Sequence, residues 1–306
     1  MRLSSLWAGM IIESLCIVFL RMWRFKSAEY RPHNREGIKH YLYKRQPIQN
    51  LMNVLYKKDN EFGRFFYSPM YVALKNFLFN YRLRKTMVSD CFLRFFPHVA
   101  TDKNVQIVDI GSGISPITPL PARTLFIDIE DEAIKFLRSR GLNAITGDIT
   151  DIPLPDSSVD LIFCSEVLEH IPDYKAALKD ISRILKINGG VIITVPVHMS
   201  YWMDDDGFVG HFRRFNPSSL VREIESSGLK VILQKPIGNW LERKLSWLAI
   251  RLARRNIRAM TNQKEVAKLQ LWLFYLANLP IFHLLRAIRF LNTNRRSSVM
   301  LFAAIK

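Results

Sequence analysis

Three aspartates at the ends of apolar runs are the residues of this chain best suited to bind a nucleoside. Asp109 lies in VQIVDIG, Asp128 ends RTLFID 19 residues later, and Asp148 follows LNAITG. A carboxylate at position 128 can accept hydrogen bonds from both hydroxyls of a ribose, and Asp148 would lie within reach of an adenine amino group. Each acid alone could instead cap a helix. Three aspartates at the ends of successive strands favour a ligand site along one edge of a sheet.

The turn after the first aspartate reads GSGISP and contains two glycines. Gly111 and Gly113 permit backbone conformations and close ligand approach that a side chain would block. The alternative is a plain tight turn. A dinucleotide site is disfavoured, because its GxGxxG fingerprint needs a third glycine where this chain has Pro116. Pro116, Pro119 and Pro121 also leave little room for a long first helix.

Seven short apolar runs supply the elements that would position these groups. Helical segments such as EDEAIKFLRSRG and DYKAALKDISRILKINGG separate several of them. Nearly continuous apolar strands that alternate with helices predict a doubly wound α/β sheet, mostly parallel. Ligands bind such sheets at the carboxyl ends of the strands. The predicted strands lie in VQIVDIG, RTLFIDI, LNAITGDI, VDLIFCSEV, GGVIITVPV, GLKVILQKP and SSVMLFAAIK.

The net charge of +17 is concentrated on the two flanks of the chain. Residues 1–100 carry 17 Lys and Arg against 6 Asp and Glu, and residues 235–306 carry 14 against 2. The segment between them carries 13 against 19, a net −6. An anionic membrane or a nucleic acid would therefore be met mainly by the flanks.

The three cysteines, Cys16, Cys91 and Cys164, are too widely spaced to suggest a disulfide framework. They indicate a reducing, cytoplasmic location. The chain has no HExxH motif and no paired CxxC motif, so no metal site is expected.

The N-terminal 100 residues form a basic region with helical spacing in places and no recognisable motif. Residues 1–26 contain an apolar run that Glu13 interrupts, and we interpret it as an interfacial or core-docked helix. A signal peptide and a membrane span are the alternatives. Further on, FFYSPMYVALKNFLFNYRLRK predicts one helix after Pro69.

The middle of the chain is similar to a known enzyme family. The motifs VDIGSG, LFIDIE, GDITDIPLPDSSVDLIFCSEVLEHI and ILKINGGVIITVP, followed by HFRRFNPSSLVREIESSGLKV, resemble class I S-adenosylmethionine-dependent methyltransferases, in particular the small-molecule group called type 11. The resemblance implies S-adenosylmethionine as cofactor and a Rossmann-like sheet of seven strands, the last antiparallel. One departure is Ser115, where the usual GxGxG turn has glycine, so we expect a short or displaced first helix.

By this resemblance, eight residues at the strand ends make the cofactor site. They are Asp109, Gly111 and Gly113 on the methionine side, Asp128 on the ribose, Ile129, Asp148 and Ile149 around the adenine, and Ser165 facing the sulfonium.

Methyl transfer from a sulfonium needs alignment more than acid–base chemistry, because the cofactor supplies the leaving group. A general base is needed only if the acceptor must lose a proton. His170, in EVLEHIP just past the fourth strand, is the candidate base or substrate contact. The alternative is a histidine at a helix start that bonds to the backbone.

The segment 198–215 follows the fifth strand and should overhang the pocket. Its candidate substrate contacts are Tyr201, Trp202, His211 and Arg213. The acidic run Asp204–Asp206 within it is interpreted as a solvated loop and not as a metal site. After the fourth strand the chain reads CSEV and lacks the [ND]PP[YF] motif of enzymes that methylate base or glutamine amines, so nucleic acid is disfavoured as the acceptor.

The insertion before the last strand predicts contact with a membrane surface. Over residues 240–258, taken as a helix, six basic residues gather on one arc beside a leucine stripe. They are Arg243, Lys244, Arg251, Arg254, Arg255 and Arg258. This composition is typical of a helix on an anionic bilayer, and the alternative is a helix docked on its own core. An uncharged segment, 269–285, follows and is interpreted as a lid or re-entrant element.

These patterns predict a methyltransferase core over 101–237 and 297–306, preceded by the helical region 1–100 and interrupted by the helical insertion 238–296. We expect methyl transfer to a small amphipathic or lipid-linked acceptor, with peripheral membrane contact through 240–258. Two alternatives remain: an RNA-associated methyltransferase, and a non-catalytic assembly factor with the same fold. The sequence does not determine the oligomeric state or the acceptor atom.

Overall fold

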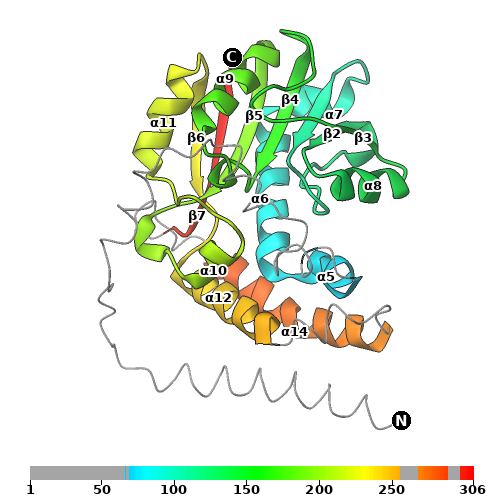
Figure 1. Cartoon of the computed structure of the whole chain (residues 1–306), viewed down its shortest axis with the longest axis vertical. Coiled ribbons are helices and arrows are strands. Elements are labelled where there is room, and N and C mark those ends of the chain that lie inside the picture. The colour runs from blue at the N-terminus through cyan, green and yellow to red at the C-terminus, as the bar shows by residue number, and fades with distance from the viewer. Residues whose placement is uncertain (1–65, 67–68, 256–267, 289–296) are drawn as a thin grey trace, which may run out of the picture.

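The computed structural model describes residues 66, 69–255, 268–288 and 297–306 (Figure 1). Seven strands form one sheet in the order β3-β2-β1-β4-β5-β7-β6. The strands from β3 to β5 pair in parallel, and β7 runs antiparallel to both β5 and β6. The predicted fold class is therefore confirmed. The strands are β1 Ile107–Ile110, β2 Thr124–Asp128, β3 Asn143–Thr146, β4 Val159–Ser165, β5 Leu185–Pro196, β6 Lys230–Pro236 and β7 Val299–Ile305.

Helices cover both faces of the sheet, and short 3-10 turns follow some of the strands. The α-helices are α5 Pro69–Leu74, α6 Phe79–Phe95, α7 Pro97–Thr101, α8 Asp131–Ser139, α9 Tyr174–Ile184, α10 Asp204–Phe208, α11 Pro217–Ser226, α12 Trp240–Arg255 and α14 Lys268–Ala287. The 3-10 turns are η1 Lys75–Phe77, η2 Pro121–Arg123, η3 Leu168–His170 and η4 Met199–Tyr201.

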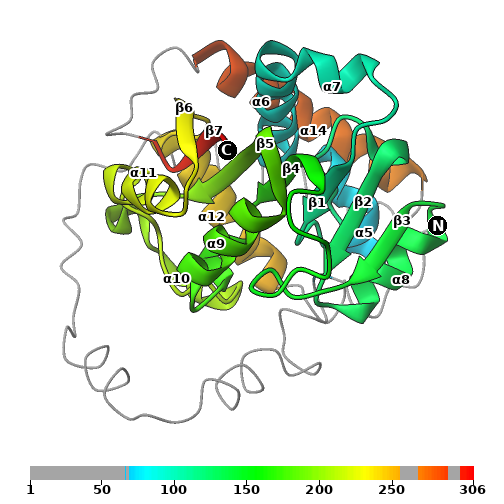
Figure 2. The ribbon, with the colours of Figure 1, turned by 90° about the horizontal axis from the view of Figure 1, so that it is seen from above.

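Alternation along the strands divides the core into two main clusters, because successive side chains of a strand point to opposite faces. Val108 and Ile110 belong to the cluster that α9 and α11 cover. Ile107 belongs to the cluster that α6, α7 and α14 cover. Figure 2 shows α9 and α11 on one side of the sheet and α6 and α14 on the other. The sheet, including the edge formed by the carboxyl ends of its parallel strands, thus lies between two layers of helices.

The prolines and the altered glycine turn predict a short or displaced first helix, and the connection from β1 to β2 goes further, because it contains no α-helix. Its one regular element is the short turn η2. Helix α6 covers the part of the sheet beside this connection, with Met87, Val88 and Phe92 buried. The Tyr81 hydroxyl at the start of α6 donates to the carbonyl of Pro116, 2.6 Å away. A helix from before the sheet therefore supports the glycine turn.

The single helix predicted after Pro69 is wrong, because the segment forms α5, η1 and α6. Leu78 has extended backbone angles, with φ −61° and ψ 129°, and separates η1 from α6. It packs against the α6 side of the core. Local helix propensity is weak enough for such packing to override it. The predictions for residues 1–26 lie outside the described residues.

Candidate active site

The glycine turn after β1 is held against the loop that follows β4. The Gly111 amide donates to the carbonyl of Ile127 at 2.7 Å. Gly111 has φ +69°, and a Cβ at this position would lie 2.7 Å from a methyl carbon of Val167. Both the backbone conformation and the space therefore require glycine here.

Asp128 connects the first two strand ends. Its Oδ2 accepts the Gly113 amide at 2.8 Å, and its Oδ1 accepts the Glu130 amide at 3.0 Å. Burial raises the pKa of Asp128, although these amide donors oppose the shift. The two oxygens have four lone pairs, and the amides of Gly113, Glu130 and Ile129 use at most three of them. The side chain is therefore oriented and can still accept a hydrogen bond from a ligand.

Asp109 is fully buried beneath the same turn. Its Oδ2 accepts the amides of Ile117 and Thr118 at 3.2 and 3.3 Å, whereas Oδ1 has no hydrogen-bond partner among the described residues. Burial raises the pKa of Asp109 to about 7, and the charge of Asp128 adds to the effect. An unpartnered buried acceptor is costly unless a ligand or a proton satisfies it.

The third strand end lies beside the second, because the Gly147 amide donates to the carbonyl of Asp128 at 3.0 Å. Asp148 is exposed, and its Oδ1 accepts both the amide and the hydroxyl of Thr150. Ile149 is buried, whereas Ile129 is 50% exposed and leaves an apolar surface beside Asp128. The predicted cofactor residues of β1 to β3 thus lie along one edge.

Beyond β4 the chain turns at Glu166, which has φ +57°, an uncommon angle for a residue with a side chain. Its carboxylate pairs with Arg84 of α6 at 3.2 Å and accepts the Thr194 hydroxyl. The hydroxyl of Ser165 bonds to the same Thr194 at 2.7 Å. The predicted sulfonium-facing residue is therefore part of a polar network that joins β4, β5 and α6. No motif in the sequence points to Arg84.

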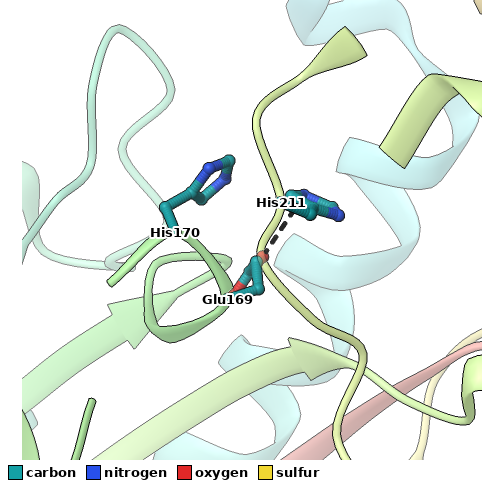
Figure 3. A group of neighbouring side chains, drawn as sticks. All are labelled: Glu169, His170 and His211. Carbon is teal, nitrogen blue, oxygen red and sulfur yellow. Dashed lines mark ion pairs between the residues drawn. The ribbon is translucent and has the colours of Figure 1, made fainter. Parts of the chain in front are cut away.

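Three potential ligand side chains meet next to this network (Figure 3). His170 and Glu169 lie on η3 after β4, and His211 lies on the segment after α10. The two histidine rings make an edge-to-face contact with centroids 4.7 Å apart. Burial and the neighbouring His211 lower the pKa of His170 to about 3, so the imidazole is neutral at pH 7. Burial, together with the charge of Glu166, holds the pKa of Glu169 well above its usual range.

The interpretation of Asp204–Asp206 as a solvated loop is wrong. These residues begin α10, and Asp205 and Asp206 are buried. Arg243 of α12 donates to both oxygens of Asp205 at 2.6 Å and to Asp206 at 2.8 Å. Arg243 is only 4% exposed, so it does not belong to the surface arc predicted for the insertion.

Asp206 joins four segments of the chain. It accepts hydrogen bonds from the backbone of Met203 and from the side chains of His211, Arg214 and Arg243. Burial opposes ionisation of Asp206, but the donors His211 and Arg214 outweigh it and hold its pKa well below the usual range. The carboxylate is therefore charged. Sequence reasoning missed it because its burial depends on Arg243, which is 37 residues away.

The other candidate substrate contacts have different surroundings. Arg213 donates to the carbonyls of Ile171 and Pro172 at 2.8 and 3.0 Å and stacks on Tyr174. Its guanidinium therefore fixes the loop between η3 and α9. Tyr201 and Trp202 are partly buried in and after η4, and Arg243 donates to the Tyr201 carbonyl at 3.0 Å. Of the four candidates, the structure places His211 against His170.

Comparison with known proteins agrees with this architecture. Residues 108–193 match the family described as "Methyltransferase domain". A probable S-adenosylmethionine-dependent methyltransferase of Mycolicibacterium smegmatis is 25% identical over 40% of this chain and 49% of that protein. The chain contains a class I S-adenosylmethionine-dependent methyltransferase domain. Its cofactor is S-adenosylmethionine.

Two further relatives extend the comparison with this methyltransferase domain. The 2-methyl-6-phytyl-1,4-hydroquinone methyltransferase 2 of Oryza sativa is 24% identical over 33% of this chain and 32% of that protein. The solved phosphoethanolamine N-methyltransferase 2 of Haemonchus contortus, in complex with S-adenosyl-L-methionine, shares the fold with a TM-score of 0.50 and 15% identity, over 85% of this chain and 60% of that one. The chain spans about half the length of the curated relatives it matches.

The residues at the edge of the methyltransferase domain fit this cofactor. The Oδ1 of Asp109, which has no hydrogen-bond partner in the described part of the chain, and the remaining lone-pair capacity of Asp128 can accept hydrogen bonds from its polar groups. Gly111 leaves no room for a side chain at the turn. The exposed Ile129 offers an apolar contact for a flat base.

Proposed function

We propose that this chain transfers a methyl group from S-adenosylmethionine to a small amphipathic or lipid-linked acceptor at an anionic membrane surface. Asp128 would hold the ribose, Ile129 and Ile149 would contact the adenine beside Asp148, and Asp109 with the glycine turn would hold the methionine end. Ser165 would lie nearest the sulfonium. When bound, the cofactor supplies the activated methyl group, and the residues of the chain orient it and exclude water.

His170 suits contact with an acceptor or ligation better than proton abstraction. Its pKa of about 3 makes it a weak general base near neutral pH. Its neutral ring still has a nitrogen lone pair. The acceptor would therefore be recognised by the polar groups beyond β4, with no strong base required.

The surface of α12 and α14 carries the membrane proposal. Trp272, Leu276 and Leu284 are 60%, 40% and 51% exposed, and their four- and eight-residue spacing places them within an arc of about 120° on α14. On α12, Trp240 is 52% exposed, and the Lys244 ammonium lies 5.4 Å from its ring centroid. Figure 1 shows both helices at the same end of the molecule, below α10 and α5.

This apolar surface is accompanied by positive charge. Arg251 is exposed on α12 and lies over Trp247, 5.3 Å from the ring centroid. Exposed aromatic and leucine side chains beside lysine and arginine are typical of helices that lie in the interface of anionic bilayers. Among the described residues, no helix is both long and apolar enough to span a bilayer. The exposed aromatic and basic side chains of α12 and α14 support contact with the surface of an anionic bilayer.

Helix α12 is also tied to the segment that carries His211. Arg243 pairs with Asp205 and Asp206 of α10, and the Trp247 indole donates to Asp204 at 2.6 Å. Docking of α12 on a membrane would thus place the region beyond β4 and β5 near that surface. The rice relative, whose name specifies a phytyl hydroquinone, supports an acceptor with a lipid tail.

Vesicle flotation with the full chain tests the surface. The protein should float with vesicles that contain acidic lipid and should partly dissociate at high salt, because screening weakens the charge attraction and leaves the apolar contribution. The double variants Lys244→Gln with Arg251→Gln, and Trp272→Ser with Leu276→Ser, should each reduce flotation. The control Lys179→Gln with Lys230→Gln removes two exposed charges outside these helices and should float normally.

Labelled S-adenosylmethionine, incubated with lipid, small-molecule and RNA extracts, tests the acceptor. Label in the lipid or amphipathic fraction supports the proposal. Label in RNA alone, or wild-type protein that stays in solution beside acidic vesicles at low salt, contradicts it.

A further inference from the structure

The side chains of Glu169, His170 and His211 form a cluster whose ligand atoms all lie within 4.8 Å of one another. We propose that these three residues bind one divalent transition-metal cation. The spacing of the residues in the sequence follows no metal-binding motif. The structure brings them together because the turn after β4 lies against the segment after α10, where the Phe212 amide donates to the Glu169 carbonyl at 2.9 Å.

The carboxylate of Glu169 is the first observation that points to a cation. The residue is fully buried, and neither side-chain oxygen accepts a hydrogen bond from another described residue. Its own backbone amide and the charges of Arg84 and Arg214 oppose the rise in its pKa but do not outweigh burial. The Nε2 of His211 faces this carboxyl group and lies 3.8 Å from Oε1. That separation is too long for a hydrogen bond. A buried carboxyl group without a donor from another residue is unfavourable in its charged form unless a proton or a cation compensates it, and a cation bound by His211 and His170 would displace the proton.

The orientation of His211 is the second, independent observation. Its Nδ1 lies 2.9 Å from Oδ1 of Asp206, a carboxylate that Arg214 and Arg243 also contact. An acceptor of this kind fixes the Nδ1–H tautomer, so the lone pair of Nε2 points toward Glu169. A carboxylate behind a histidine is the usual outer partner of a metal-binding imidazole. Asp206 is therefore a positioning residue, outside the ligand set.

The distances permit ligation with small side-chain movements. Histidine nitrogen and carboxylate oxygen ligands lie about 2.0–2.2 Å from a bound zinc ion, so two ligands of one ion are at most about 4.3 Å apart. The 3.8 Å between His211 and Glu169 is within this limit, and the largest separation of 4.8 Å exceeds it by a fraction of an ångström. His170 bonds to the backbone of Gly210, which can orient its ring.

Two imidazoles and one carboxylate suit zinc, iron(II) or manganese(II), whereas magnesium prefers oxygen ligands alone. Three protein ligands leave coordination positions open for another molecule. If the proposed methyl transfer holds, an acceptor with a hydroxyl or carboxylate oxygen could occupy these positions. This last step rests on the proposed function, whereas metal binding itself does not.

Metal binding is tested on the full chain without cofactor or acceptor, so its outcome is separate from that of methyl transfer. After treatment with a chelator and dialysis into metal-free buffer, the wild-type protein is titrated calorimetrically with Zn²⁺. We expect one bound ion per chain. Glu169→Gln and His211→Gln should each weaken binding by about 100-fold or more, at or above the upper end of what loss of an outer partner produces. The control His98→Gln removes an exposed histidine on α7 and should bind normally.

Cobalt(II) substitution gives a second readout that needs no variant. Visible absorption bands of a four- or five-coordinate cobalt site with nitrogen and oxygen ligands, abolished by an excess of Zn²⁺, support the proposal. It is wrong if the wild-type chain takes up neither Zn²⁺, Mn²⁺ nor Fe²⁺ at micromolar concentrations. It is equally wrong if folded Glu169→Gln and His211→Gln proteins bind Zn²⁺ as tightly as wild type.

Discussion

The two halves of the site edge are built in different ways. At the ends of β1 to β3, the interactions of the acidic side chains are local: Gly113 and Asp128 are 15 residues apart, and Ile117 and Asp109 are 8 apart. Beyond β4 and β5 the polar contacts join distant segments. Asp206 and Arg243 are 37 residues apart, and Arg214 donates to Ser298 across 84. The first half can therefore be inferred from strand ends, whereas the second depends on how the insertion packs.

The largest effect should follow loss of Asp206, because two buried arginines would lose a shared partner. Breaking a buried ion pair on one side typically costs about 3–5 kcal/mol. We expect Asp206→Ala to lower the free energy of unfolding by that amount in denaturant titrations. Asp204 lies two residues before Asp206 but is exposed. Asp204→Ala should lower the free energy of unfolding by about 1 kcal/mol or less, through loss of its hydrogen bond to Trp247. If Asp206→Ala and Asp204→Ala lowered the free energy of unfolding equally, the stability of the α10 region would not depend on its buried charge.

In the local half, Asp128→Ala should weaken S-adenosylmethionine binding by roughly 10- to 150-fold. The estimate assumes a charge-assisted hydrogen bond of about 1.5–3 kcal/mol. Asp148 is exposed, and one of its oxygens already accepts from Thr150, so Asp148→Ala should weaken binding by roughly 2- to 10-fold. Calorimetry on proteins with unchanged circular dichroism checks both. An unaltered affinity in Asp128→Ala would remove this residue from the ribose site.

A smaller effect, on the pH dependence of stability, is expected from Lys75 in η1. It lines a cavity of about 320 Å³ beside the β1–β2 connection, together with Lys85 and Arg140. Its ammonium has no hydrogen-bond partner among the described residues and lies 4.8 Å from the ring centroid of Phe136. Burial, reinforced by Arg140 and Lys85, lowers the pKa of Lys75 from 10.5 to about 7.

The sign of the resulting pH dependence follows from proton binding. Between pH 7 and 10.5 the unfolded chain holds a proton on Lys75 that the folded chain has released, so stability should rise with pH in this window. From pH 7.5 to 9 we expect a gain of about 1–2 kcal/mol in the unfolding free energy. Lys75→Met should remove this slope and be more stable than wild type at pH 7.5. Identical slopes in both proteins would exclude Lys75 as the origin.

The sequence by itself determined the sheet and the shared edge at which the proposed cofactor residues lie. Near-continuous apolar runs marked all seven strands, and Pro116 with its neighbouring prolines indicated that the β1–β2 connection has little room for a long helix. Asp109 and Asp128 could be placed because the carboxyl ends of parallel strands meet at one edge. In such cases a residue's position in its strand decides its neighbours, so the sequence pattern is sufficient.

Only the tertiary structure decided the partners of the charged residues beyond β4. Helical periodicity grouped Arg243 with Lys244 and Arg251, yet Arg243 is buried and the other two are exposed. Periodicity reports which residues share a helix face, but it does not say which part of that face meets another segment. A run of three aspartates predicts a solvated loop, because such residues are rarely buried unless paired, yet Asp205 and Asp206 are buried. The meeting of Glu169 with His211 likewise depends on the packing of α10 and α12, because burial and charge pairing are properties of the assembled chain.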